Sequence, residues 1–209
     1  MTPWDRIAAG GEVAIVLFRH GRTAWNAERR FLGTSDVPLD DQGLAEVERL
    51  AHLRSAFVAI YSSPLARARQ TAEGLAPPPI RIVDALRELH HGALEGLTGP
   101  EAMARYPEFL AAFAGDPTDL RVPEGETLGE VRERALAAVR AIAAAHAPGD
   151  RVAVVSHQMV IASLVCTLSG ESLAGWRRYG VPNTGTAVLR WDGAELRISP
   201  PASSVRDTS

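Results

Sequence analysis

The feature that most constrains the fold is a continuous apolar run at residues 13–18, VAIVLF, which follows Gly10-Gly11 and ends in Arg19-His20-Gly21. A strand with one face in water alternates apolar and polar residues, whereas this run is apolar throughout. It therefore predicts a strand that is buried on both faces, as in a parallel sheet covered by helices. The run is too short for a secretion signal or a membrane span.

Extended and helical patterns alternate after this run. Strands are predicted at residues 57–61, 80–83 and 151–156, and a terminal hairpin at 186–191 and 195–198. Helices are predicted to begin near residues 40, 62, 127 and 158, with a mixed helical insert at 100–121. This alternation predicts an α/β fold of three layers, α/β/α, with a mostly parallel sheet.

Two of the helix starts carry local signals. Ser62-Ser63 followed by Pro64 provides serine at the N-cap and proline at the first helical position. Thr127 and Glu130 have the spacing of a capping box, in front of a long alanine-rich stretch.

The length of 209 residues suits one domain over residues 1–209. Within it we expect a loose leader at residues 1–11, a flexible tail at 200–209 and a cap over the site at 90–125. The sequence has no internal repeat and no low-complexity linker that would divide the chain.

Charge and cysteine content exclude some classes of protein. The net charge of −3 argues against general nucleic-acid binding, which needs a basic face. All 22 basic residues are arginines, so each arginine is a weaker indicator of bidentate chemistry than usual. Cys166 is the single cysteine, which precludes an intrachain disulfide and suits a reducing compartment. We therefore expect a soluble cytoplasmic protein that binds neither nucleic acid nor membranes.

Several polar residues follow the predicted strands directly, at the edge where α/β sheets bind ligands. Arg19 and His20 end the first strand, Arg67 comes soon after the second, Glu88 follows the third and His157 follows the fourth. Helix N-termini at the same edge favour an anion. The sequence therefore predicts one anion site to which four segments of the chain contribute side chains.

These residue types match the needs of phosphoryl transfer. Guanidinium groups grip phosphoryl oxygens, a neutral imidazole can accept the group covalently, and a protonated glutamic acid can supply the leaving group with a proton. The six histidines do not form a ligand-spaced set with cysteines or carboxylates, so we expect neither a metal nor another cofactor.

The pattern Arg19-His20-Gly21-x-Thr23-x-x-Asn26 resembles the signature of the histidine phosphatase superfamily, also called the phosphoglycerate mutase-like family. Five further blocks resemble that family in its usual order. They lie at residues 30–43, 61–72, 86–96, 123–135 and 152–159, so the resemblance extends over nearly all of 13–190.

The resemblance implies a phosphoglycerate mutase-like fold and a role for each site residue. His20 would form the phosphohistidine, and Glu88 would protonate the leaving group and then activate water. The phosphate pocket would be lined by Arg19, Arg67 and His157. Thr23 and Asn26 would contact the phosphoryl group or hold the loop, and Gly21 would allow close backbone approach.

Two features depart from the family pattern. Gln158 and Met159 follow the second histidine, where glycine is common, and these bulkier residues would narrow substrate choice. His90-His91 lies in a variable block and offers either loop packing or contacts to an acidic substrate.

Each site residue also has a plain structural reading. His20 and His157 could be satisfied histidines at strand ends, Arg67 a surface helix residue, and Glu88 a partner of Arg87 or of a helix end. The ordered blocks favour the catalytic reading over these alternatives.

The predicted function is a metal-independent phosphomonoester hydrolase of the histidine acid phosphatase type, acting on a small phosphorylated metabolite as a monomer or homodimer. The alternative is a cofactor-dependent phosphoglycerate mutase, but the short stretch between Glu88 and His157 favours the phosphatase. A non-catalytic phosphate-binding protein is disfavoured because all five key residues are present.

Overall fold

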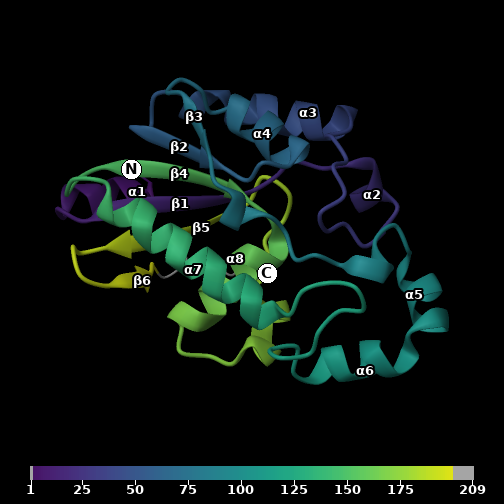
Figure 1. Cartoon of the computed structure of the whole chain (residues 1–209). Helices are drawn as coiled ribbons and strands as arrows, with labels where there is room; N and C mark the ends of the chain where they lie inside the picture. Colours follow the sequence, from purple (N-terminus) through teal and green to yellow (C-terminus); the bar gives the residue numbers. More distant parts are fainter. Residues whose placement is uncertain (1, 200–209) are drawn as a thin grey trace, which may run out of the picture.

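The computed structural model describes residues 2–199 and is built around one six-stranded sheet in the order β3-β2-β4-β1-β5-β6 (Figure 1). The strands are β1 (Val13–Arg19), β2 (Ala59–Ser62), β3 (Ile80–Ile82), β4 (Arg151–Ser156), β5 (Thr186–Trp191) and β6 (Leu196–Ile198). β3, β2, β4 and β1 pair in parallel, whereas β5 pairs antiparallel with β1 and β6 antiparallel with β5. The predicted, mostly parallel sheet and the terminal hairpin are thus confirmed.

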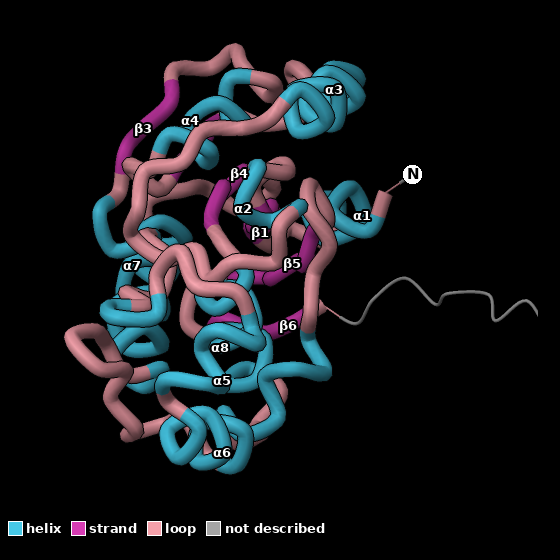
Figure 2. Tube along the Cα trace, turned by 90° about the vertical axis from the view of Figure 1, so that its right-hand side faces the viewer, coloured by secondary structure: helices cyan, strands magenta, loops and turns pink. Residues whose placement is uncertain are grey.

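The side chains of β1 enter two separate apolar cores on opposite faces of the sheet. Val13, Ile15 and Leu17 belong to the larger core, which contains residues of α7 (Leu128–Ala144) and α8 (Gln158–Leu168). Val16 and Phe18 belong to the smaller core, with residues of α4 (Ala66–Glu73). Figure 2 shows α3 (Asp41–Glu48) and α4 on one side of the strands and α7 and α8 on the other. The apolar run is continuous because both of its faces are buried, which confirms the three-layer fold.

The remaining elements are short and lie mostly in the connections between strands. The other α-helices are α1 (Pro3–Ala9), α2 (Ala24–Ala27), α3 (Asp41–Glu48), α5 (Gly99–Arg105) and α6 (Pro107–Gly115). The 3₁₀ helices are η1 (Arg49–Leu53), η2 (Asp84–Leu86), η3 (Gly92–Leu94) and η4 (Leu173–Tyr179). Helices α5 and α6 fall in the stretch 90–125, whose role as a cap stays a prediction.

The start of α7 follows its sequence signal. Thr127 Oγ1 accepts a hydrogen bond from Glu130 N at 3.1 Å, and Glu130 Oε2 accepts one from Thr127 N at 2.9 Å. The capping box is therefore confirmed, and it satisfies two of the backbone donors that a helix start leaves open.

The prediction of a loose leader is wrong for the described part of residues 1–11. Thr2 and Asp5 form a capping box that starts α1, and Ile7 of this helix is buried. Arg151 at the start of β4 donates to Asp5 Oδ1 at 2.7 Å. A local cap and an ion pair with the sheet thus order this segment. The predicted flexible tail at 200–209 lies outside the described residues.

The predicted start of a helix at Ser62-Ser63-Pro64 is also wrong. Helix α4 begins at Ala66, with Leu65 at the N-cap and no side-chain cap. Ser62 is the last residue of β2, and the Ser63 hydroxyl bonds to His157 instead of capping a helix. A contact from a distant segment therefore displaced the local signal.

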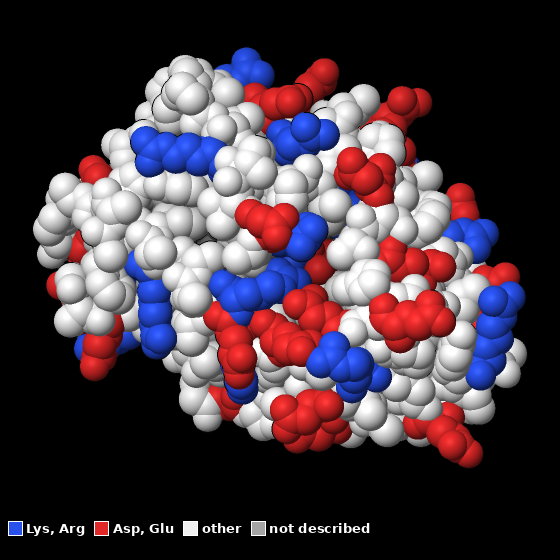
Figure 3. Space-filling view, in the orientation of Figure 1, with Lys and Arg blue, Asp and Glu red and all other residues white. Residues whose placement is uncertain are grey.

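Within residues 2–199, the surface charges, the helix lengths and the possible metal ligands bear on the predicted partners. In the face shown in Figure 3, acidic and basic side chains are interspersed, and neither sign forms a continuous patch. No single helix in this range is long and apolar enough to cross a membrane, although α8 and η4 together match the length and composition of a span bent by 114°. This range also holds no cluster of histidine, cysteine and carboxylate side chains suited to a metal ion.

Candidate active site

The sheet brings the two predicted catalytic histidines together. β1 and β4 are adjacent and parallel, and Arg19 is the register partner of Ser156. The residues that follow, His20 and His157, therefore leave the sheet side by side, with their ring centroids 5.1 Å apart. The backbone N–H of His20 donates to Ser156 O at 3.0 Å, which fixes this juxtaposition.

The environment of His20 fixes its protonation state and its tautomer. Its Nδ1 lies 2.7 Å from the carbonyl oxygen of Gly21, which can only accept, so Nδ1 carries the proton and Nε2 keeps its lone pair. Burial and the nearby positive charge of Arg67 lower the pKa of His20 well below its usual value. His20 is therefore a neutral imidazole with Nε2 available as a nucleophile.

Within residues 2–199, Arg67 is the largest side chain that is completely buried. It projects from the first turn of α4 and donates through its Nη atoms to Gly33 O at 2.7 Å and Ser35 O at 2.9 Å. Burial lowers the pKa of Arg67 to about 10, so it remains a cation at neutral pH. The surface-helix reading of Arg67 is therefore wrong.

The loop that accepts from Arg67 is itself held by Glu95. This carboxylate accepts from the backbone N–H groups of Thr34 at 2.7 Å and Ser35 at 2.8 Å, and from both hydroxyl groups. Glu95 thus supports the two carbonyls that orient the guanidinium of Arg67.

Arg19 lies at the end of β1 and reaches toward the C-terminal segment. Its Nη1 donates to Val181 O at 2.7 Å and to Gln158 Oε1 at 3.3 Å, while Gln158 Oε1 also accepts from Val181 N at 3.1 Å. Gln158 is one of the two residues that depart from the family pattern. Its side chain therefore links Arg19 to the backbone at Val181.

His157 begins α8 and is completely buried. Its Nε2 lies 2.8 Å from Ser63 Oγ, and within residues 2–199 the buried Ser63 hydroxyl has no other acceptor for its proton, so it donates to Nε2. His157 Nδ1 then carries the N–H of this neutral imidazole. Burial, together with the charge of Arg67, lowers the pKa of His157 well below its usual value.

Three buried N–H donors of this site have no hydrogen-bond partner within residues 2–199. They are Arg19 Nε, Arg67 Nε and His157 Nδ1. Buried donors are nearly always paired in folded proteins, and an unpaired one costs about 1–3 kcal/mol. Their combination with two guanidinium charges fits an anionic ligand with several acceptor oxygens.

Glu88 provides the only acidic group among the predicted catalytic residues. Its Oε1 accepts from Leu89 N at 2.9 Å, and its Oε2 accepts from Met159 N at 3.2 Å in the first turn of α8. Burial raises the pKa of Glu88 above its usual value in spite of these bonds and of the cations Arg67 and Arg19. A carboxyl of this kind can be held protonated as a general acid. The reading of Glu88 as an ion-pair partner of Arg87 is wrong, because Arg87 pairs with Asp84. The alternative reading, a bond to a helix end, agrees with the bond from Met159 N at the start of α8.

Thr23 and Asn26 form the capping box of α2 and bond to each other. Thr23 Oγ1 accepts from Asn26 N and Asn26 Oδ1 accepts from Thr23 N, both at 3.2 Å. The structure thus places them as holders of the loop after His20, and their contact with a phosphoryl group stays a prediction. In the same loop, the backbone of Gly21 lies close to that of Gly43, because a Cβ at Gly21 would lie 3.0 Å from Gly43 O. This agrees with the close backbone approach expected at Gly21.

Asn183 is a site residue that the sequence did not indicate. Its Nδ2 donates to the carbonyl oxygen of His20 at 3.0 Å and to Asn26 Oδ1 at 3.4 Å. In the sequence, Pro182-Asn183 suggests only a turn, so no signal pointed to a contact with a residue 163 positions away.

The adjacent histidines take different positions. His91 is buried against the edge of Phe31, and burial lowers its pKa to about 4, so it serves loop packing. His90 lines a cavity of about 530 Å³ that lies beside Glu88. The other lining residues are Thr34, Arg87, Arg121, Gly125, Glu126, Glu130 and Arg134.

Comparison with known proteins agrees with this geometry. The family model described as histidine phosphatase superfamily (branch 1) matches residues 15–200. The chain belongs to the histidine phosphatase superfamily. The stretch matched includes His20, Arg67, Glu88 and His157.

Relatives within the histidine phosphatase superfamily carry both phosphatase and mutase names. A metal-independent phosphoserine phosphatase of Arabidopsis thaliana is 36% identical over 169 residues, which cover 77% of this chain and 71% of that one. A phosphoglycerate mutase-like protein 4 of the same plant is 39% identical over 158 residues, covering 72% and 68%. The solved structure of YhfR from Bacillus stearothermophilus superposes with a TM-score of 0.84 at 31% identity, covering 92% and 98%.

Proposed function

We propose that this protein is a phosphatase that hydrolyses phosphomonoesters of small metabolites through a phosphohistidine at His20. The observation that carries the proposal is the set of three unpaired buried donors beside a neutral His20 with an available Nε2. Membership of the family and the phosphoserine phosphatase among its relatives support the same activity.

The first chemical step would transfer the phosphoryl group to the protein. His20 Nε2 attacks phosphorus, the bond from phosphorus to the ester oxygen breaks, and Glu88 gives its proton to that oxygen. Arg19, Arg67 and the Nδ1–H of His157 would hold the phosphoryl oxygens, whose charge shifts during transfer.

The second step would regenerate the enzyme. Glu88, now a carboxylate, takes a proton from water while the water oxygen attacks phosphorus, and the bond between phosphorus and Nε2 breaks. Inorganic phosphate leaves, and Glu88 is again protonated. No step requires a group beyond the side chains of this site and water.

The mutase alternative requires more than the same chemistry. A mutase has to keep its acidic intermediate bound until the phosphoryl group returns, which calls for additional cationic groups near the pocket. The arginines that line the cavity beside Glu88 are occupied, since Arg121 pairs with Glu130, Arg134 with Glu126 and Arg87 with Asp84. This pairing favours release of the alcohol and hence the phosphatase.

The proposal is tested by a screen of phosphorylated metabolites, including phosphoserine and 3-phosphoglycerate, on protein treated with a chelator. We expect release of inorganic phosphate without interconversion of 2- and 3-phosphoglycerate. Rapid interconversion would establish the mutase instead, and loss of activity on chelation would contradict the metal-independent mechanism. A cytoplasmic location and a monomeric or homodimeric state stay predictions.

A further inference from the structure

The segment that carries Glu88 lies outside every helix and strand. It runs from Arg87 to His91, between η2 and η3, so no continuous ladder of backbone hydrogen bonds holds it. The Glu88 carboxyl nevertheless has to come within hydrogen-bond distance of a leaving oxygen. Misplacement of a catalytic group by about 1 Å can cost on the order of 10²-fold in rate. Another part of the protein must therefore fix this backbone.

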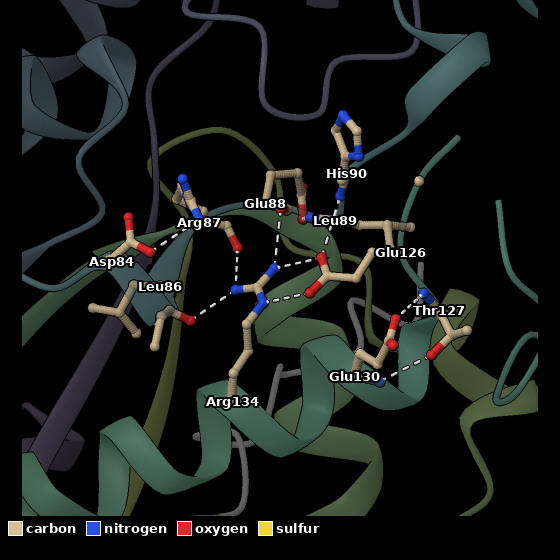
Figure 4. Close-up of polar contacts among 12 residues, drawn as sticks. Asp84, Leu86, Arg87, Glu88, Leu89, His90, Glu126, Thr127, Glu130 and Arg134 are labelled. Carbon is tan, nitrogen blue, oxygen red and sulfur yellow. Dashed lines mark hydrogen bonds and ion pairs between the residues drawn. The ribbon is translucent and has the colours of Figure 1, made fainter. Parts of the chain in front are cut away.

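The guanidinium of Arg134, on α7, contacts this segment directly (Figure 4). Its Nη1 donates to Ala85 O at 2.7 Å and to Arg87 O at 2.6 Å, and its Nη2 donates to Glu88 O at 3.1 Å. Within residues 2–199 these carbonyls accept from no other protein group. Arg134 thus supplies the hydrogen bonds that a helix or a strand would otherwise provide to this backbone.

Glu126 completes the arrangement from the opposite side of the guanidinium. Its Oε1 accepts from Arg134 Nε at 2.8 Å and its Oε2 from Arg134 Nη2 at 2.9 Å. Glu126 also holds the same segment at His90, whose N–H donates to Oε2 at 3.3 Å and whose carbonyl accepts from Glu126 N at 3.1 Å. The backbone on both sides of Glu88 is therefore tied to one ion pair.

The donor count distinguishes positioning from substrate binding. A guanidinium has five N–H donors in a rigid fork, and the five contacts to two carboxylate oxygens and three carbonyls use them all. Arg134 therefore has no donor left for a ligand, although it lines the cavity beside Glu88. A lysine has only three donors and no planar fork, so it cannot reproduce this set.

We propose that Arg134, paired with Glu126, is the positioning residue that holds the backbone of the acid Glu88 for proton transfer to the leaving group. The inference rests on the proposed phosphatase activity and adds a residue to it. Because Arg134 and Glu126 neutralise each other, the pair places no net charge beside Glu88. The cations that act on the Glu88 carboxyl are those of the phosphate pocket, Arg67 and Arg19.

The test compares two esters whose leaving groups differ in their need for a proton. p-Nitrophenolate leaves without protonation, whereas an alkoxide requires it. In Arg134→Gln we expect kcat/KM for the best alkyl phosphate of the screen to fall on the order of 10²-fold, with a clearly smaller loss for p-nitrophenyl phosphate. Arg134→Lys should recover only part of the loss. Arg132→Gln, on the same helix, is the matched control and should behave as the wild type.

A second variant changes Glu126, the carboxylate that pairs with Arg134. It tests the role of the ion pair while Arg134 itself is kept. In Glu126→Gln the charge of Arg134 is no longer neutralised, and a nearby cation favours the carboxylate form of Glu88. The alkaline limb of the kcat/KM profile should therefore move to lower pH. If Arg134→Gln fails to fold, the position of the alkaline limb in Glu126→Gln still tests the role of the pair.

The outcomes separate the two proposals. Wild-type protein that hydrolyses neither ester contradicts the proposed function and with it this inference. Wild-type turnover combined with equal losses on both esters, or with an unmoved alkaline limb in Glu126→Gln, overturns the role of Arg134 and leaves the phosphatase intact.

Discussion

The two sides of Glu88 are built in opposite ways. On the side of His20, three buried donors lack partners among residues 2–199, and in the same range Arg19 and Arg67 have no carboxylate within salt-bridge distance. On the side of the cavity, the charged groups neutralise one another, as in Arg134 with Glu126 and Arg121 with Glu130. The first region is prepared for an anion, whereas the second already has its charges balanced.

This difference indicates how the two regions divide the work. The phosphate pocket accepts the cost of unpaired donors because a bound phosphoryl group repays it with charge-assisted hydrogen bonds. The cavity region pairs its charged groups internally, which suits a segment that has to hold an acid in place. Changes in the pocket should thus reduce rate far more than changes in the exposed charges of the cavity.

The largest effect should come from the nucleophile. His20→Ala should remain folded and lose activity on the order of 10⁶-fold, as expected when the nucleophile of a covalent hydrolase is removed. The unpaired donors of Arg19, Arg67 and His157 persist in this variant, so calorimetry should still detect binding of inorganic phosphate. An active variant would remove His20 from the nucleophile role.

Arg67 should rank second. Arg67→Ala removes a buried cation from the phosphoryl group and should lower kcat on the order of 10³-fold, the scale of an arginine that stabilises phosphoryl-transfer charge. The matched control is Arg69→Ala, two residues along α4 and exposed, which should leave the rate unchanged. Equal rates in the two variants would place Arg67 outside the catalytic pocket.

The dependence of kcat/KM on pH should be the mildest of these effects. His20 acts as a neutral nucleophile, and its pKa is lowered by burial, so activity is lost as pH falls through a value below the usual 6.5. Glu88 acts as the acid, and its pKa is raised by burial, so activity is lost as pH rises through a value above the usual 4.5. Each limb should change the rate about tenfold per pH unit.

Glu88→Gln sharpens this prediction, because glutamine neither titrates nor donates the required proton. The variant should lose the alkaline limb and about 10²-fold in rate on alkyl phosphates. Titration of the substrate itself persists in wild type and variant alike, so the difference between the profiles isolates Glu88. If the alkaline limb persists in Glu88→Gln, a group other than Glu88 gives the proton to the leaving group.

Sequence patterns predicted the scaffold well because they are local. The apolar run at 13–18, the capping box at Thr127 and the hairpin around Asp192-Gly193 depend on near neighbours. The rule that ligands lie at the carboxyl ends of parallel strands then brought His20 and His157 to the same edge. Where a distant contact competed with a local signal, prediction failed: the Ser63 hydroxyl bonds to His157 and caps no helix.

By itself, the sequence determined the layered fold, the polar residues that follow each parallel strand and the chemical groups available for phosphoryl transfer. Only the tertiary structure decided which groups are left unpaired, which nitrogen of His20 is available, and that Asn183 and Arg134 support the loops around the acid and the nucleophile. The reason is physical. Burial, tautomer and donor count depend on partners that lie far along the chain, and residue types with their spacing do not specify which of those partners meet.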